Sequence, residues 1–339
     1  METMRAAVFE GVGKLVIKEV PVPEITRPDQ VLIEVEACSI CGTDVHITAD
    51  PPGYIATPNT ILGHEFCGIV RAKGSQADQI DIGDRVVINP NNYCGKCVYC
   101  RKNLPNQCEH IEALGIDYNG AFAKYCVVSD KVVYKISKEI DPAVAACAEP
   151  LACAVNGLNK VDVKPGDSAV VIGSGPIGLM IAMLLHKSGI DRLYLLETAP
   201  KRVCFAQKLQ LAKVINPIEE DAAGIILGET GIGADFVFDV TGSQVTASVN
   251  LARKGGTVVL FGVNKQARRE IAQCEITTKE LRVQGTWLAN ATFPQAVKII
   301  ESGAIDLRAL ITDEIGLDQL PASLEALAKG EGIKVIVRP

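Results

Sequence analysis

The first part of the chain, up to about residue 140, alternates apolar and polar positions with a period of two. This alternation is clear in residues 5–36, which a proline-rich turn interrupts, and it returns in residues 68–74 and 125–137. A period of two is typical of strands that bury one face. The pattern therefore predicts a first part rich in β structure, joined by irregular loops.

The pattern changes at Asp141. Residues 141–160 are rich in alanine, and their apolar positions predict helices with buried faces. From Lys164 onward, short apolar strands alternate with helices, which is typical of a parallel sheet covered on both faces. A helix is expected in residues 291–307, and a last strand in residues 333–339. The chain is thus predicted to have a β-rich part followed by an α/β part.

Length and composition fit two globular domains. The chain has 339 residues, more than one ordinary core accommodates, and it is 48% hydrophobic and 22% charged. Its formal net charge is −6 and its pI is about 5.4. Proteins that bind nucleic acid through the phosphate backbone usually carry a basic surface. We therefore expect no nucleic-acid partner.

The sequence predicts neither an export signal nor a membrane span. Its first residues, METMRAAVFEG, contain no uninterrupted apolar run. Residues 168–185 are long enough to span a bilayer and carry no charge, but Gly173, Gly175, Pro176 and Gly178 interrupt them. A strand, a tight turn and a buried helix fit this segment better. We expect a cytoplasmic protein in a reducing compartment, where disulfides are disfavoured.

Four cysteines lie close together in the segment NYCGKCVYCRKNLPNQC, residues 92–108. Cys94, Cys97, Cys100 and Cys108 have the spacing CxxCxxCx7C. Short CxxC steps let a tight loop direct two sulfurs to one point, as in tetrahedral zinc sites with four thiolates. The alternative is a reduced loop without metal. We predict a structural zinc ion bound by all four cysteines.

A glycine-rich turn, VVIGSGPIG, follows a predicted strand and begins a helix. Gly173, Gly175 and Gly178 form GxGxxG in the context that dinucleotide-binding folds require. Their roles are the tight turn, the approach of the pyrophosphate and close helix–strand packing. The next strand ends at Glu197, whose carboxylate favours NAD over NADP at the ribose. We assign to the same cofactor site Pro176, Ile177, Arg202, Thr241, Gly262 and Val263.

A second set of potential metal ligands lies in the first part, in ICGTDVH and LGHEFCG. Cys41, His64 and Glu65 combine a thiolate, an imidazole and a carboxylate, which suits zinc with an open position. Glu149, where the β-rich part gives way to helices, is a further candidate ligand. Taken singly, Cys41 fits a small buried residue and His64 fits a core histidine. The combination favours a catalytic metal.

These motifs, in this order, resemble the zinc-dependent medium-chain dehydrogenase/reductase superfamily over essentially the whole chain. The carrying segments are ICGTDVH, LGHE, the four-cysteine lobe, EPLAC and VVIGSGPIG. They are most similar to the sorbitol, polyol and threonine dehydrogenase branch. The resemblance implies a GroES-like catalytic domain in residues 1–153 and 289–339, with the zinc lobe at about 92–110, and a Rossmann NAD-binding domain in residues 154–288.

The resemblance also implies roles for individual residues. Cys41 and His64 match the catalytic zinc ligands, and Glu65 matches the acidic ligand of the polyol branch. Glu149 falls where that branch places a glutamate near the metal. Thr43 matches the hydroxyl that takes the substrate's proton. His46 matches the histidine that passes the proton on.

The expected function is NAD-linked, reversible oxidation of a secondary alcohol of a polyol, free or phosphorylated, to a ketone by a homodimer or homotetramer. The first alternative is an L-threonine or other alcohol dehydrogenase of the same superfamily. An alternative of another class is a non-catalytic regulatory protein that combines a zinc ribbon with a Rossmann domain.

The sequence differs from mammalian-type sorbitol dehydrogenases at positions that the resemblance places near the substrate. Ile47 stands where mammalian-type sorbitol dehydrogenases have an aromatic residue, and Leu288 and Ala289 stand where they have an Arg–Tyr pair. These differences favour a substrate other than sorbitol.

Overall fold

The structure, a computed structural model, describes residues 2–339 and divides into two units. One unit comprises the described residues up to Ala152 together with Ala289–Pro339, and the other comprises Cys153–Leu288. The helix α4 (Ala148–Leu158) begins in the first unit and ends in the second. The chain therefore leaves the first unit once and returns to it.

A seven-stranded sheet forms the centre of the first unit. Its strand order is β10-β6-β5-β3-β18-β17, and β9 also pairs with β3. Along β3, Val31, Ile33 and Val35 point into the main core of this unit, as the alternating pattern predicts. The strands are β3 (Gln30–Ser39), β5 (Glu65–Lys73), β6 (Arg85–Ile88), β9 (Tyr125–Ser129), β10 (Val133–Lys135), β17 (Ile311–Gly316) and β18 (Lys334–Arg338).

Two small sheets and several short helices complete this unit. One sheet has the order β2-β1-β4, and β7 pairs with β8. These strands are β1 (Thr3–Gly11), β2 (Lys14–Pro21), β4 (Thr60–Ile61), β7 (Asn91–Asn92) and β8 (Glu112–Ala113). The helices are α1 (Gly42–Thr48), α2 (Val98–Arg101), α3 (Pro142–Ala145), α10 (Phe293–Glu301) and α11 (Leu320–Ala328), with 3-10 turns at Pro105–Gln107, Asp130–Val132, Leu307–Leu310 and Leu317–Gln319.

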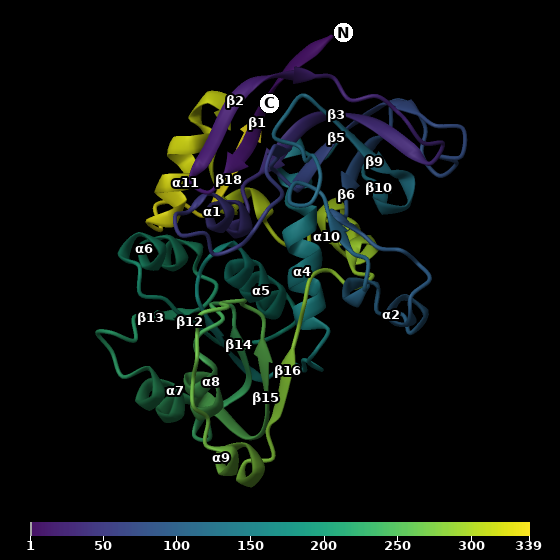
Figure 1. Cartoon of the computed structure of the whole chain (residues 1–339). Helices are drawn as coiled ribbons and strands as arrows, with labels where there is room; N and C mark the ends of the chain where they lie inside the picture. The colour runs from purple at the N-terminus through teal and green to yellow at the C-terminus, as the bar shows by residue number, and fades with distance from the viewer. Residues whose placement is uncertain (1) are drawn as a thin grey trace. The chain divides into compact units, whose positions relative to one another are not determined.

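The C-terminal strand is an internal part of the first unit. β18 pairs antiparallel with β3, so that Ile336 lies opposite Ser39, and it pairs parallel with β17. Figure 1 shows these last residues in yellow beside the purple N-terminal strands. This pairing brings Lys334, at the start of β18, next to the ends of β3 and β5.

The second unit is a six-stranded parallel sheet with helices. Its strand order, β13-β12-β11-β14-β15-β16, corresponds to the order 3-2-1-4-5-6 of the Rossmann fold. The strands are β11 (Ser168–Ile172), β12 (Arg192–Leu196), β13 (Lys213–Ile215), β14 (Ala234–Asp239), β15 (Ala252–Leu260) and β16 (Arg282–Gly285). The helices are α5 (Pro176–Lys187), α6 (Pro200–Leu209), α7 (Ala222–Thr230), α8 (Val245–Leu251) and α9 (Gln273–Thr278).

The uncharged segment of residues 168–185 forms β11 and most of α5, as its glycines predict. Across residues 2–339, every helix is too short or too polar to cross a bilayer. Among the elements that the sequence pattern missed are α7, α9, β17 and α11. The expected helix in residues 291–307 is shorter in the structure, because α10 ends at Glu301.

Candidate metal and cofactor sites

The four cysteines of the lobe converge on one point. The sulfurs of Cys94, Cys97, Cys100 and Cys108 lie within 4.8 Å of one another. Sγ of Cys97 is 3.5 Å from that of Cys100 and 3.9 Å from that of Cys108. Tetrahedral zinc with Zn–S bonds of about 2.3 Å requires sulfurs about 3.8 Å apart. The donor set and its spacing therefore fit a four-thiolate zinc site.

The backbone of the lobe supports thiolates. The N–H groups of Cys94 and His110 both donate to Sγ of Cys108, each at 3.3 Å. The pKa of Cys97 is lowered to about 6, chiefly because the backbone N–H of Cys100 donates to its sulfur. Since zinc binds the deprotonated thiol, these donors favour metal binding.

Cys41, His64 and Glu65 form a second group in the first unit. Cys41 follows β3 and caps the N-terminus of α1, while His64 and Glu65 lie at the start of β5. Ser39 and Glu65 are register partners, so the β3–β5 pairing brings the three together. Their ligand atoms lie within 4.8 Å of one another, and His64 and Glu65 are buried. One sulfur, one nitrogen and one oxygen fit zinc with an open fourth position.

Asp44 lies behind His64. The backbone N–H of Cys41 donates to Oδ2 of Asp44 at 2.9 Å, and Nδ1 of His64 lies 3.5 Å from Oδ1. With Nδ1 turned toward this carboxylate, His64 leaves Nε2 for a metal. A carboxylate on the far side of a ligating imidazole is a common way to fix ring orientation.

The carboxylate of Glu65 has two donors of its own. Ser39 Oγ and Lys334 Nζ both donate to Oε2, and Lys334 also donates to the carbonyl of Ile40 at 3.1 Å. Lys334 is 1% exposed. Burial lowers the pKa of Lys334, but the charge of Glu65 outweighs it and raises the pKa overall, so Lys334 is charged.

Two of the three candidate ligands, Cys41 and His64, have a raised pKa. Burial, followed by the charge of Glu65, raises the pKa of Cys41. Burial lowers the pKa of His64, but the charges of Asp44 and Cys41 outweigh it, and the pKa is raised well above its usual range. A metal that binds here must therefore displace protons from both residues.

The remaining residues expected at this centre lie as follows. Glu149 is buried in the first turn of α4 and is not part of the group of three. Thr43 is half-buried and His46 is exposed, both on α1. The ring of His46 packs against Gly53, where an added Cβ would lie 3.2 Å from Nδ1.

The glycine-rich turn joins β11 to α5 in the second unit. Gly173 has a φ of +105°, which favours glycine, and a Cβ on Gly178 would lie 1.9 Å from the carbonyl oxygen of Gly173. Gly175 caps α5, and Pro176 and Ile177 form its first turn. Backbone N–H groups at the start of this helix are suitable donors to a phosphate.

Glu197 lies after β12 and accepts hydrogen bonds from the glycine-rich turn. Oε2 accepts from the backbone N–H and the hydroxyl of Ser174, both at 2.9 Å, and Oε1 accepts from the N–H groups of Thr198 and Ala199. Burial raises the pKa of Glu197, but these donors outweigh it and lower the pKa overall. The carboxylate is therefore charged.

Arg202 and the loop that follows β14 lie near the glycine-rich turn. Nη1 of Arg202 is 3.8 Å from the position of a Cβ on Gly175. Nε of Arg202 is buried and has no hydrogen-bond partner within residues 2–339. Asp239 accepts from both the N–H and the hydroxyl of Thr241. Gly262 packs against the backbone of this loop, and Val263 is exposed.

Sequence reasoning missed Ser39, Asp44, Lys334 and Asp239. Asp44 had a local signal, since it follows the capping residue Cys41 by three positions. Lys334 had none, because its partner lies 269 positions away in the sequence.

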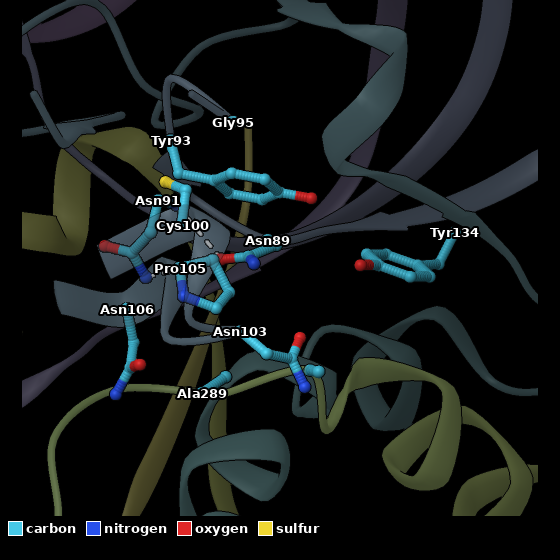
Figure 2. A pocket seen from close by; sticks show the side chains of 11 residues that line it. Asn89, Asn91, Tyr93, Gly95, Cys100, Asn103, Pro105, Asn106, Tyr134 and Ala289 are labelled. Carbon is cyan, nitrogen blue, oxygen red and sulfur yellow. Dashed lines mark hydrogen bonds between the residues drawn. The ribbon is translucent and has the colours of Figure 1, made fainter. Parts of the chain in front are cut away.

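A cavity of about 210 Å³ borders the four-cysteine lobe. Figure 2 shows Asn89, Asn91 and Tyr93 around it, with Tyr134 on another side. Its lining is uncharged and does not include the three residues of the candidate catalytic group. The lining residues are Asn89, Asn91, Tyr93, Gly95, Cys100, Asn103, Pro105, Asn106, Tyr134, Ala289 and Ala291.

Comparisons with known proteins agree with this fold. Residues 27–138 match the family described as alcohol dehydrogenase GroES-like domain, and residues 176–302 match the family described as zinc-binding dehydrogenase. D-arabinitol dehydrogenase 1 of Uromyces fabae is 34% identical over 343 residues, covering 99% of this chain and 97% of that relative. L-threonine 3-dehydrogenase of Bacillus velezensis is 34% identical over 331 residues, covering 95% of each chain.

A solved structure is similar over its full length. It is a putative zinc-binding dehydrogenase from Sinorhizobium meliloti bound to NADP, with a TM-score of 0.94, 34% identity and 100% of both chains covered. Family profiles, full-length relatives and fold agree, and they exclude a non-catalytic zinc-ribbon protein. The chain belongs to the zinc-dependent medium-chain dehydrogenase/reductase superfamily and is a zinc-dependent NAD(P) alcohol or polyol dehydrogenase.

Proposed function

We propose that this enzyme oxidises a secondary alcohol of a polyol to a ketone, reversibly, with NAD as the hydride acceptor. The observation that carries the proposal is the group Cys41, His64 and Glu65. Its carboxylate, Glu65, matches the acidic ligand of the polyol branch, which the segments GTDVH and EPL also resemble. The similarity to D-arabinitol dehydrogenase 1 supports the same substrate class.

We assign the catalytic metal to Cys41, His64 and Glu65. Zinc, when bound, polarises the substrate oxygen and makes its proton more acidic. Asp44 orients the imidazole of His64. Glu149 remains outside the group of three, so we assign it a place beside the metal rather than a permanent bond to it.

We assign proton transfer to α1. Thr43 lies two positions after Cys41, so its hydroxyl is suited to accept the proton of the substrate alcohol. His46 lies one helical turn further, on the same face of the helix as Thr43, and is exposed. An exposed side chain with a basic nitrogen is suited to pass the proton on to solvent. Thr43 and His46 would thus form a route from the substrate to water.

We assign the dinucleotide to the glycine-rich turn and to Glu197. The N-terminus of α5 and Arg202 are suited to the pyrophosphate. The carboxylate of Glu197 is suited to a ribose with free hydroxyls and disfavours a 2′-phosphate. We therefore propose NAD as the preferred cofactor, although the solved relative binds NADP.

A substrate panel tests the proposal. Purified enzyme would be assayed with NAD and with NADP against pentitols, hexitols, polyol phosphates, L-threonine and simple alcohols, with the carbonyl product identified by mass spectrometry. We expect the highest kcat/KM for a polyol with NAD, and a ketone as the product. An aldehyde product, or turnover of simple alcohols alone, would contradict the proposal.

L-threonine is the second candidate substrate, because an L-threonine 3-dehydrogenase is as similar to this chain as the arabinitol enzyme. The same panel separates the two. We further propose a homodimer or homotetramer, which native mass spectrometry of the purified protein would test.

A further inference from the structure

Lys334 is a buried lysine beside the candidate metal centre. It lies at the first position of β18, is 1% exposed, and contacts Oε2 of Glu65 through Nζ. A buried charge is strongly unfavourable unless a partner compensates it. The carboxylate of Glu65 and the carbonyl of Ile40 provide that compensation here. The pair is therefore built into the core of the first unit.

The contacts distinguish the two oxygens of Glu65. Lys334 and Ser39 both donate to Oε2. Oε1 receives no hydrogen bond from any residue within the described range 2–339. Oε1 is therefore the oxygen left for a metal, and the carboxylate is held in place by its other end.

The charges of the candidate ligands also indicate a role for Lys334. A thiolate from Cys41 and the carboxylate of Glu65 together offset both charges of a divalent metal, while neutral His64 adds none. Such a metal would polarise a substrate oxygen less than one held by neutral ligands. The ammonium group of Lys334 contacts Glu65 and offsets part of the negative charge of that carboxylate. Asp44, on the other side, faces His64.

We propose that Lys334 is a positioning residue of the metal centre, which holds Glu65 to a single metal-binding oxygen and offsets part of its negative charge. The metal then stays a stronger Lewis acid than its two anionic ligands alone would allow. This inference rests on the proposed assignment of Cys41, His64 and Glu65 as metal ligands.

A purely structural role for Lys334 makes the opposite prediction. If the residue only fastened β18 to β3 and β5, its removal would loosen the site and the metal would be lost. If it offsets the charge of Glu65, its removal makes the carboxylate a stronger donor. The metal would then bind more tightly, and catalysis would be slower. The two roles differ in the sign of the change in metal affinity.

The test uses Lys334→Met, which keeps the length of the side chain without its charge, and Lys334→Gln, which keeps a donor without the charge. Lys334→Arg restores the charge. Lys73→Met is the matched control, because Lys73 also pairs within this unit, with Ile80 and Asp81, at the far end of β5. Metal affinity would be measured by chelator competition, and the coordination of cobalt(II) at the catalytic site by its visible absorption.

We expect Lys334→Met to raise metal affinity by about tenfold or more, because Glu65 without its cationic partner becomes a stronger donor to the metal. Its kcat should fall by at least a similar factor, with little change in KM. The cobalt absorption should weaken, because a carboxylate bound through both oxygens raises the coordination number. Lys334→Gln should behave like Lys334→Met. Lys334→Arg and the control Lys73→Met should both remain close to the wild type.

Lys334 is proposed to affect the metal through Glu65, so a double variant provides a second measurement. In the Glu65→Gln background, Lys334→Gln should change metal affinity by less than about twofold, because the coupled carboxylate is absent. Loss of metal from Lys334→Gln, or an unchanged affinity and cobalt spectrum, would overturn the inference. The affinity and spectral measurements need no substrate, so a wrong substrate class would not affect them. If Lys334→Met does not fold, Lys334→Gln alone decides.

Discussion

Oδ1 of Asp44 lies 3.5 Å from Nδ1 of His64, and both side chains are buried. The other oxygen of Asp44 accepts from the backbone N–H of Cys41. One carboxylate thus connects the backbone of one candidate metal ligand with the ring of another. The short helix α1 serves to bring this carboxylate to the centre, because Asp44 occupies the third helical position after the capping cysteine.

Replacing Asp44 should weaken metal binding without removing a ligand. Asp44→Asn should lower zinc affinity at the catalytic site by about 10- to 100-fold, which is typical when the partner of a ligating histidine is lost. Metal analysis after dialysis against a weak chelator would measure this. The four-cysteine zinc should be retained. Asp318→Asn, which alters an exposed pair with Arg5, is the control, and equal metal content in both variants would contradict the prediction.

The stability gained from zinc should increase with pH. The pKa of His64 is raised, so the His64–Asp44 attraction stabilises the metal-free fold fully below about pH 6.5 and is lost as pH rises through the raised pKa. Zinc must also displace the proton of Cys41, whose pKa burial raises. Both effects weaken zinc binding in acid. We expect the difference in Tm between zinc-loaded and metal-free enzyme to grow from pH 6 to pH 9, and a constant difference would contradict this.

The sequence predicted the fold class and the two groups of candidate ligands that the structure brings together, because both have local signals. CxxC spacing, a glycine-rich turn after a strand, and alternating apolar positions are all readable over a few residues. Lys334 and Ser39 were not predictable in this way, since their contacts with Glu65 depend on the pairing of β3 with β5 and β18. β17 was missed because it is an edge strand whose residues Asp313 and Glu314 are exposed, which hides the alternation.

Loss of one lobe cysteine should remove one metal only. Cys97→Ser should reduce zinc from two ions per chain to one and lower Tm, because a structural zinc site contributes directly to folding. The catalytic ligands are unaffected, so residual activity should persist at low temperature. Cys204→Ser is the control, since Cys204 is exposed and outside both groups. A variant with one zinc and wild-type Tm would argue against a structural role.

Glu197 should affect cofactor binding and cofactor choice together. Glu197→Ala removes the acceptor for two donors of Ser174 in the glycine-rich turn and for the N–H groups of Thr198 and Ala199, and NAD affinity should fall by about tenfold or more, as lost hydrogen bonds to a charged group predict. Rejection of NADP should relax, because a negative charge is also lost. Fluorescence titration with both cofactors would measure the ratio of affinities.

The matched control for Glu197 is Asp235. Its carboxylate accepts from the N–H and hydroxyl of Ser168, at the opposite end of β11 from Ser174. Asp235→Ala should lower stability but leave the ratio of NAD to NADP affinity unchanged. If Glu197→Ala weakened both cofactors by the same factor, Glu197 would only support the turn.

Loss of Thr43 and loss of His46 should have different effects on activity. His46 is exposed and lies outside the metal group, so His46→Ala should keep both metals and bind NAD. It should slow alcohol oxidation by up to about 10²- to 10⁴-fold, and most strongly below neutral pH, where release of a proton is hardest. Thr43→Val should be more severe, because it removes the hydroxyl nearest the substrate. Added imidazole should partly restore His46→Ala, since a soluble base can accept the proton in place of the side chain, and should not restore Thr43→Val. Loss of metal from His46→Ala would instead make His46 a ligand, and the assignment of Cys41, His64 and Glu65 would then be wrong.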